Sequence, residues 1–189
     1  GVLRELNYSR IGFLGHTYPG MLDMYSDFTM HHAQLGAHVE VLEIDDLQAR
    51  VQAVQEDEVE AKIAEIKHTF ELAAPGKDKI SMPVTDEALR WSARVAAGLD
   101  KLVQDFELNG LTYYYRGLNG NESEELGASL IVGNSLLTAR GVPASGEGDL
   151  KTCMAMLIMD RLGAGGSYTE FYAMDFNEDF ILMGPDGPG

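Results

Sequence analysis

Short apolar runs alternate with longer amphipathic stretches along most of this chain, and the alternation predicts a layered α/β fold. Runs of β-type residues predict buried strands over 11–15, 39–44 and 111–115. Apolar residues at helical spacing predict helices over 21–35, 48–72, 85–106, 124–139 and 150–162. Strands separated by helices are joined in parallel, so we expect a layered parallel sheet with flanking helices, of the Rossmann-like or flavodoxin-like class.

Polar and turn-forming residues mark where these elements begin and end. Asp45 and Asp46 are expected to be N-caps for the second helix, and the segment that begins at Thr85 is expected to cap the third. Residues 73–84 carry prolines, a glycine and charges and predict an exposed loop. Residues 116–121 predict the loop at the carboxyl end of the third strand, where ligands of open α/β sheets gather.

The pattern changes near the C-terminus. Residues 167–176 and 179–183 predict two strands around a polar turn, which is typical of the start of an antiparallel region. We therefore expect a central α/β domain over 1–165 and the beginning of a β-rich C-terminal domain over 166–189. A chain divided in this way is expected to be a fragment of a longer protein.

Composition and charge narrow the class of protein. The 189 residues are 45% hydrophobic and 8% aromatic, as in an ordinary soluble globular domain, and their formal net charge is −16. Such a charge repels phosphate backbones and anionic lipid, so we expect neither nucleic acid nor a membrane as a partner. The chain begins with no signal-like segment, and the lone Cys153 cannot form an internal disulfide. We expect a cytoplasmic protein in which Cys153 packs as a small hydrophobic residue.

Two glutamates are the best candidates for chemistry. Glu147 lies between two glycines at a turn that precedes an apolar helix, and Glu170 lies in a strand of aromatic and small residues. A carboxylate in either setting needs a partner, and two of them suggest a site for a hard divalent cation. The structural alternative is that Glu147 starts the helix at its positive dipole end while Glu170 is an ordinary exposed strand residue.

Three segments carry a resemblance to a known family. They are residues 10–21 (RIGFLGHTYPGM), 146–152 (GEGDLKT) and 165–170 (GGSYTE). With these segments the chain resembles the L-arabinose isomerase family, which shares its fold with the L-fucose isomerases. The resemblance implies an aldose–ketose isomerase that acts by enediol proton transfer on an open-chain sugar. It also implies dependence on Mn²⁺, or on another divalent cation such as Mg²⁺ or Co²⁺.

The resemblance further implies a metal ringed by two glutamates and two histidines. Glu147 and Glu170 match the glutamates, as metal ligands and as catalytic residues. The first histidine would follow the strand that ends at Met183, where this sequence has Pro185 and Asp186 instead. That histidine is either replaced or lies beyond residue 189, and the second belongs to the C-terminal part of the family.

Substrate-binding candidates lie at the ends of the predicted strands. His16 and Tyr18 follow the first strand, and the resemblance makes Tyr18 a substrate-lining position. Arg116 follows the third strand and is suited to bind sugar hydroxyls, although ion pairing with nearby glutamates is an equally good interpretation. The resemblance implies a monosaccharide substrate and a homo-oligomer, and the sequence does not identify the sugar.

Two other functional classes remain open, and two more are disfavoured. A non-catalytic α/β module that binds sugar or mediates assembly after losing part of the metal site is the main alternative, and a periplasmic-type sugar-binding protein is a third. Gly12 and Gly15 do not complete a dinucleotide-binding pattern, and no Gly-x-Ser-x-Gly sequence is present. The sequence therefore does not support NAD binding or serine hydrolase chemistry.

Overall fold

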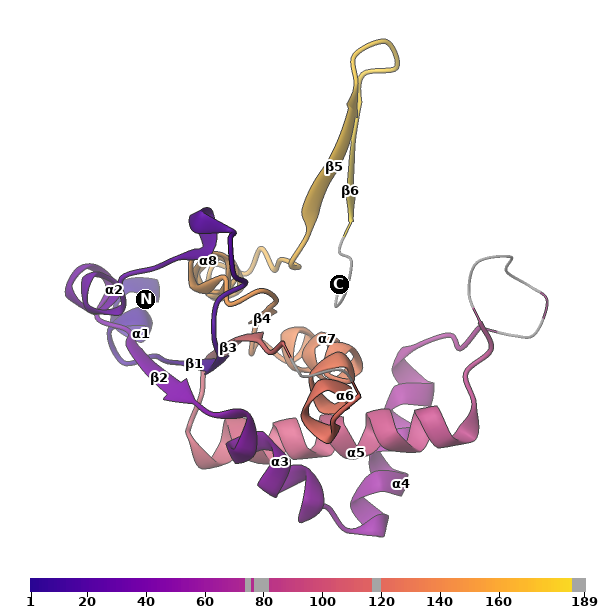
Figure 1. Cartoon of the computed structure of the whole chain (residues 1–189). Coiled ribbons are helices and arrows are strands. Elements are labelled where there is room, and N and C mark those ends of the chain that lie inside the picture. Colours follow the sequence, from indigo (N-terminus) through magenta and orange to yellow (C-terminus); the bar gives the residue numbers. More distant parts are fainter. Residues whose placement is uncertain (74–75, 77–81, 117–119, 185–189) are drawn as a thin grey trace.

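A four-stranded parallel sheet forms the centre of the α/β part of the molecule (Figure 1). The computed structural model describes residues 1–73, 76, 82–116 and 120–184. The strands are β1 (Arg10–Gly15), β2 (His38–Leu42), β3 (Gly110–Tyr114) and β4 (Ala144–Ser145), in the order β2-β1-β3-β4. All three neighbouring pairs are parallel, which confirms the predicted fold class.

Helices cover both faces of this sheet. One face carries α1 (Val2–Asn7), α2 (Phe28–Leu35) and α8 (Leu150–Arg161); the other carries α3 (Ile44–Gln52), α5 (Asp86–Asp105), α6 (Glu122–Ala128) and α7 (Ile131–Ala139). Side chains of β1 alternate between the faces: Ile11 packs in the cluster with Cys153, and Leu14 packs in the cluster with Leu99. A further helix, α4 (Glu56–Thr69), packs on α5 outside the second layer.

The predicted helix over 21–35 is shorter than expected. A single 3₁₀ turn, η1 (Leu22–Met24), precedes α2. The α-helix begins after Asp27, whose carboxylate accepts a hydrogen bond from the Met30 amide at 3.0 Å. This N-cap satisfies an amide at the first turn, so the helix starts there although apolar spacing begins earlier.

The predicted helix over 48–72 is two helices, α3 and α4, with a break at residues 53–55. Glu58 accepts a hydrogen bond from the Gln55 amide at 2.8 Å, which begins the second helix. The expectation that Asp45 and Asp46 are N-caps was wrong, because α3 begins at Ile44 after its N-cap residue Glu43. Asp46 instead accepts from the Glu43 amide at 2.9 Å from within the first turn.

A similar break divides the predicted helix over 124–139 into α6 and α7. Asn121 is the N-cap of α6 and accepts from the Glu124 amide at 2.8 Å. Ser129 ends α6, where its hydroxyl donates to the Glu125 carbonyl and accepts from the Trp91 indole at 2.7 Å. The helix over 85–106 was predicted well, since Thr85 is its N-cap and accepts from the Ala88 amide.

Two elements were not predicted. Helix α1 precedes the first strand, and β4 has only two residues, Ala144 and Ser145, which pair with Leu111 and Thr112 of β3. A strand of two residues is too short for its side-chain alternation to be recognised. Parts of both predicted loops, residues 74–75 and 77–81 of the first and 117–119 of the second, lie outside the described residues.

A hairpin follows the α/β part and projects away from it (Figure 1). Its strands, β5 (Glu170–Asp175) and β6 (Phe180–Gly184), are antiparallel, as predicted. Exposed apolar side chains occur on both strands: Phe171, Tyr172, Met174, Phe180, Ile181, Leu182 and Met183. The hairpin therefore buries little of its own apolar surface.

Cys153 of α8 packs in the core against β3, as expected. Its side chain is fully buried, and burial raises the pKa of its thiol to about 12. A thiol with that pKa stays protonated at neutral pH, so Cys153 acts as a core residue. None of the helices within the described part of the chain is long and apolar enough to span a membrane.

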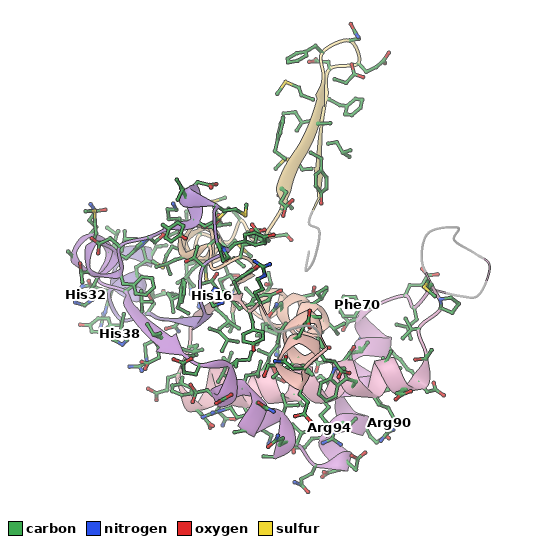
Figure 2. The ribbon with its side chains drawn as sticks, viewed as in Figure 1. His16, His32, His38, Phe70, Arg90 and Arg94 are labelled. Atoms are coloured by element: carbon green, nitrogen blue, oxygen red, sulfur yellow. The ribbon has the colours of Figure 1, made fainter. Side chains whose placement is uncertain are left out.

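Ion pairs join the helices of the outer layer. Arg90 and Arg94 of α5 pair with Glu56 of α4, and Arg90 also pairs with Glu60 (Figure 2). A less exposed cluster lies where α4, α5 and the end of α7 meet. There the Lys62 ammonium, 8% exposed, lies 2.6 Å from Asp100 and 2.5 Å from Glu65.

We expect Asp100→Ala to lower the free energy of unfolding by about 2 kcal/mol. Asp100 accepts from both Lys62 and Arg140, so its removal leaves two cations sharing the single carboxylate of Glu65. The magnitude lies between roughly 1 kcal/mol for exposed pairs and about 3 to 5 kcal/mol for buried ones.

Urea denaturation measures this difference. Asp105→Ala is the matched control on the same helix, because Asp105 is 54% exposed and pairs only with Arg50 among the described residues. We expect the control to cost less than about 1 kcal/mol. Equal costs for the two variants would show that the Lys62 cluster behaves as a surface ion pair.

Candidate functional site

A cavity of about 580 Å³ opens at the carboxyl ends of β1, β3 and β4. Ligands of open parallel sheets bind at this edge because the connecting loops converge there. Its lining includes three carboxylates, one arginine and several tyrosines, among them Glu124, Glu147, Glu170, Arg116, Tyr18, Tyr114 and Tyr168. Four of the five residues singled out from the sequence thus line one cavity, and His16 is the exception.

Glu147 lies in a tight turn between β4 and α8. Its φ of 62° is in the left-handed region, which costs free energy for a residue with a side chain. The turn is held by hydrogen bonds from the Gly148 amide to the Tyr113 carbonyl, at 2.9 Å, and from the Tyr18 amide to the Glu147 carbonyl, at 3.0 Å. A Cβ on Gly148 would lie 2.8 Å from the carbonyl oxygen of His16, so only glycine fits there.

Asp149, and not Glu147, caps helix α8. Its carboxylate accepts from the Thr152 amide at 3.0 Å and from the Thr152 hydroxyl at 2.5 Å. Its carbonyl accepts from the Ser145 hydroxyl at 2.8 Å. The alternative that Glu147 starts helix α8 is therefore wrong, because Asp149 is the N-cap residue and Glu147 lines the cavity.

Tyr168 contacts Glu147 directly. Its hydroxyl donates a hydrogen bond to Oε2 of Glu147 at 3.1 Å. Burial raises the pKa of the Glu147 carboxyl, and the negative charge of Glu170 raises it further, while the hydrogen bond from Tyr168 lowers it. Burial and the Glu147 charge also raise the pKa of the Tyr168 phenol, so Tyr168 remains a neutral donor.

Glu170 is the first residue of β5 and enters the cavity from the hairpin side. Together Glu147 and Glu170 supply hard oxygen donors of the kind that Mg²⁺ and Mn²⁺ prefer. In the described part of the chain, no cluster of three or more His, Cys, Asp or Glu side chains is arranged to hold a metal ion. The two carboxylates have the donor chemistry that suits a hard divalent cation, and by themselves they are fewer than such an ion needs.

Tyrosine rings form one wall of the cavity. The Tyr18 and Tyr114 rings lie 4.6 Å apart between centroids. His16, which Figure 2 labels, does not line the cavity; its ring contacts the Tyr114 ring edge-on at 5.1 Å, and its Nδ1 lies 3.0 Å from the Thr17 carbonyl. His16 therefore contacts the aromatic wall without lining the cavity, and the prediction that it binds substrate stays a prediction.

Arg116 lies at the rim of the cavity, at the end of β3. Within the described residues it forms no ion pair with Glu122, Glu124 or Glu125, the partners that the alternative interpretation requires. Glu124 instead accepts a hydrogen bond from the Gly120 amide. The Arg116 guanidinium is the positive charge of this cavity lining, which otherwise carries three glutamates.

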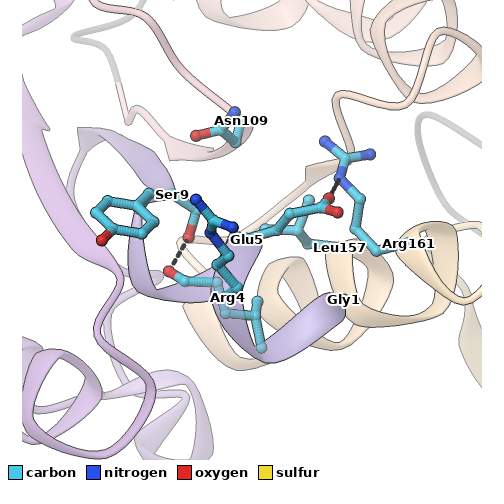
Figure 3. A pocket seen from close by; sticks show the side chains of 9 residues that line it. Gly1, Arg4, Glu5, Ser9, Asn109, Leu157 and Arg161 are labelled. Atoms are coloured by element: carbon cyan, nitrogen blue, oxygen red, sulfur yellow. Dashed lines mark hydrogen bonds and ion pairs between the residues drawn. The ribbon is translucent and has the colours of Figure 1, made fainter.

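A second hollow, of about 460 Å³, lies at the amino ends of the strands (Figure 3). Ser9 and Asn109, which precede β1 and β3, contribute to its lining. Arg161 and Glu5 pair with each other there at 3.1 Å. This hollow lies at the amino ends of the strands, and ligands of open parallel sheets bind at the carboxyl ends, so we do not assign the main site to it.

Tyr168 was not predicted as a site residue. The sequence did contain a signal, because Tyr168 and Glu170 are two positions apart and extended chains place such residues on one side. Tyr113, which also lines the cavity, was not predicted either. Burial raises the pKa of its phenol, and the nearby Asn134 side chain lowers it. The side-chain amide of Asn134 is buried and has no hydrogen-bond partner among the described residues.

The family of the chain follows from comparison with family models. Residues 26–165 match the model of the L-arabinose isomerase central domain, which is well over half of the chain. No curated protein matches the chain. Glu147 and Arg116 lie inside the matched range, whereas Tyr18 and Glu170 lie outside it. With its parallel sheet and its match over most of its length, the chain belongs to the L-arabinose isomerase family through its central domain.

Proposed function

We propose that this chain carries part of the active site of a metal-dependent aldose–ketose isomerase. The observation that supports this most directly is the convergence of Glu147 and Glu170, from a turn and from a separate hairpin, on one cavity. Glu147 and Glu170 form no ion pair with a described basic residue, although Arg116 lines the same cavity, and their mutual repulsion would be relieved by a bound cation. Membership of a sugar isomerase family provides the reaction for which such a cation is used.

Glu147 and Glu170 would hold the divalent cation, Mn²⁺ or another such as Mg²⁺ or Co²⁺. When bound, the ion would supply Lewis-acid polarisation of the sugar oxygens at the reacting carbons. Pro185 and Asp186, where the resemblance places the first histidine, lie outside the described residues, and the further ligands are not assigned. The chain's own contribution is two carboxylates held by a rigid turn and by a strand.

The same cavity has groups suited to an open-chain sugar. Faces of the Tyr18 and Tyr114 rings offer an apolar wall for the C–H side of the carbon chain. Arg116 donates to hydroxyl oxygens at the rim. A carboxylate that reaches C1 or C2 accepts the proton from one carbon and returns it to the other, and Glu147 or Glu170 is proposed for this step.

The domain organisation, the substrate and the assembly of the protein are proposed on the same basis. Residues 1–165 would form the central domain, and residues 166–189 would begin a β-rich domain that covers the exposed apolar faces of the hairpin. The substrate would be a monosaccharide, and the active protein a cytoplasmic homo-oligomer. These assignments rest on the family and on the exposed hairpin.

Metal removal and replacement tests the proposed reaction. We expect the complete protein, stripped with chelator, to convert no aldose, and Mn²⁺ to restore conversion of one member of a panel of aldopentoses and deoxyhexoses. Ketose formation is measured directly. A folded, Mn²⁺-loaded protein that converts none of these sugars but binds one in calorimetry would instead establish the non-catalytic sugar-binding module.

A further inference from the structure

Tyr168 is buried in a segment where its neighbours are exposed. Between residues 158 and 184, all of which the structure describes, it is the only buried residue, with 7% of its surface exposed. Phe171 is 58% exposed and Phe180 is 51% exposed in the strands that follow. In this described segment, which leads into and forms the hairpin, Tyr168 is therefore the one side chain buried against the rest of the protein.

The Tyr168 ring and hydroxyl both contact the turn that carries Glu147. A Cβ on Gly146 would lie 3.3 Å from Cε1 of Tyr168, so the ring lies directly against the backbone at that glycine. The hydroxyl donates to Oε2 of Glu147 at 3.1 Å. One side chain thus packs against the turn and orients the carboxylate that projects from it.

Tyr168 also restricts the position of the second carboxylate, that of Glu170. Glu170 lies two positions further along, and both residues line the same cavity. Since two residues of extended chain span at most about 7 Å, burial of Tyr168 limits how far Glu170 can move from Glu147.

We propose that Tyr168 is a positioning residue of the metal site: it fastens the β5–β6 hairpin to the Glu147 turn and occupies Oε2 of Glu147, which leaves Oε1 for the cation. This rests on the proposed function. Residues that hydrogen-bond a ligating carboxylate restrict its orientation, and their loss weakens metal binding. The hydroxyl is responsible for orienting Glu147, and the ring is responsible for anchoring the hairpin.

The two parts of this role are separated by two substitutions in the complete protein. Tyr168→Phe keeps the ring, and we expect it to weaken Mn²⁺ binding by about 10- to 100-fold in an electron paramagnetic resonance titration of free Mn²⁺. Amide hydrogen exchange over residues 167–184 stays as in the wild type. Tyr168→Ala removes the ring as well, and we expect faster exchange over the same residues.

Two further variants make the result independent of folding defects. Tyr8→Phe removes an exposed hydroxyl outside the site and is expected to leave Mn²⁺ affinity unchanged. Gly146→Ala places a methyl group 3.3 Å from the Tyr168 ring without touching any carboxylate, and we expect it to weaken Mn²⁺ binding by several-fold.

The outcomes distinguish this inference from the proposed function. Wild-type affinity in Tyr168→Phe, together with lost affinity in Glu147→Gln, would overturn the orienting role while leaving the metal site in place. Unchanged exchange in Tyr168→Ala would overturn the anchoring role. Wild-type affinity in Glu147→Gln, or no Mn²⁺ binding by the wild type, would overturn the metal site and this inference with it.

Discussion

Glu147→Gln is expected to lower kcat for Mn²⁺-dependent isomerisation by about 10³-fold, because it removes the charge that binds the cation and one candidate for proton transfer. Glutamine keeps the shape of the side chain, and its amide oxygen still accepts from Tyr168, so the fold should persist. Turnover with saturating sugar, measured across Mn²⁺ concentrations, separates weaker metal binding from slower chemistry.

Glu170→Gln is expected to lower kcat for Mn²⁺-dependent isomerisation to a similar extent. Burial raises the pKa of Glu147 in the wild type and the charge of Glu170 raises it further, and both substitutions relieve this repulsion between the carboxylates. Neither should therefore lower the free energy of unfolding. Glu107→Gln is a matched control, because Glu107 also has a left-handed φ, of 53°, but lies in the turn between α5 and β3.

Both glutamine variants must lose activity if Glu147 and Glu170 belong to the site. Activity near wild type in Glu147→Gln or Glu170→Gln would show that the carboxylate in question is not part of the site. A comparable loss in Glu107→Gln would show that the substitutions act through the backbone of strained turns.

Gly15→Ala is expected to have the largest effect on stability, a loss of about 3 kcal/mol or more in the free energy of unfolding. Gly15 ends β1 with a φ of 81°, and a Cβ there would lie 2.2 Å from the carbonyl oxygen of Tyr114. That carbonyl accepts from the His16 amide at 3.0 Å, so the clash falls on backbone that joins β1 to β3. Backbone cannot rotate away as a flexible side chain does.

Gly20→Ala separates the two sources of this loss. Gly20 has a φ of 92°, but a Cβ there would meet nothing within 4 Å. Its substitution therefore carries only the cost of a left-handed backbone, roughly 1 to 2 kcal/mol. Urea denaturation of both variants gives the contribution of the clash as a difference, and equal stability of the two would refute the close approach of β1 and β3 at Gly15.

Strands β1, β2 and β3 were predicted to within a few residues because each is a run of β-type residues. The expectation that all three are buried was wrong for β2, which is an edge strand with Leu42 as its one buried residue. The helix ends were predicted less well. Asp27, Gln55 and Ser129 each begin or end a helix through hydrogen bonds that hydrophobic spacing does not reveal.

The candidate site was predicted in part. Glu147 and Glu170 stood out from their sequence surroundings, and they line one cavity in the structure. Tyr168 did not stand out, because an aromatic residue before a strand is ordinary and its importance comes from a hydrogen bond to a residue 21 positions earlier. Arg116 was predicted from its place after β3, and its role in binding stays a prediction.

The sequence by itself determined the class of fold, the resemblance to the L-arabinose isomerase family and the two carboxylates, since each depends on residue types within a short window. Only the tertiary structure decided that Tyr18, Glu147, Tyr168 and Glu170 converge on one cavity and that His16 contacts the Tyr114 ring without lining that cavity. Contacts between segments far apart in the chain follow from how helices and strands pack, and no periodicity in the sequence encodes which side chains then meet.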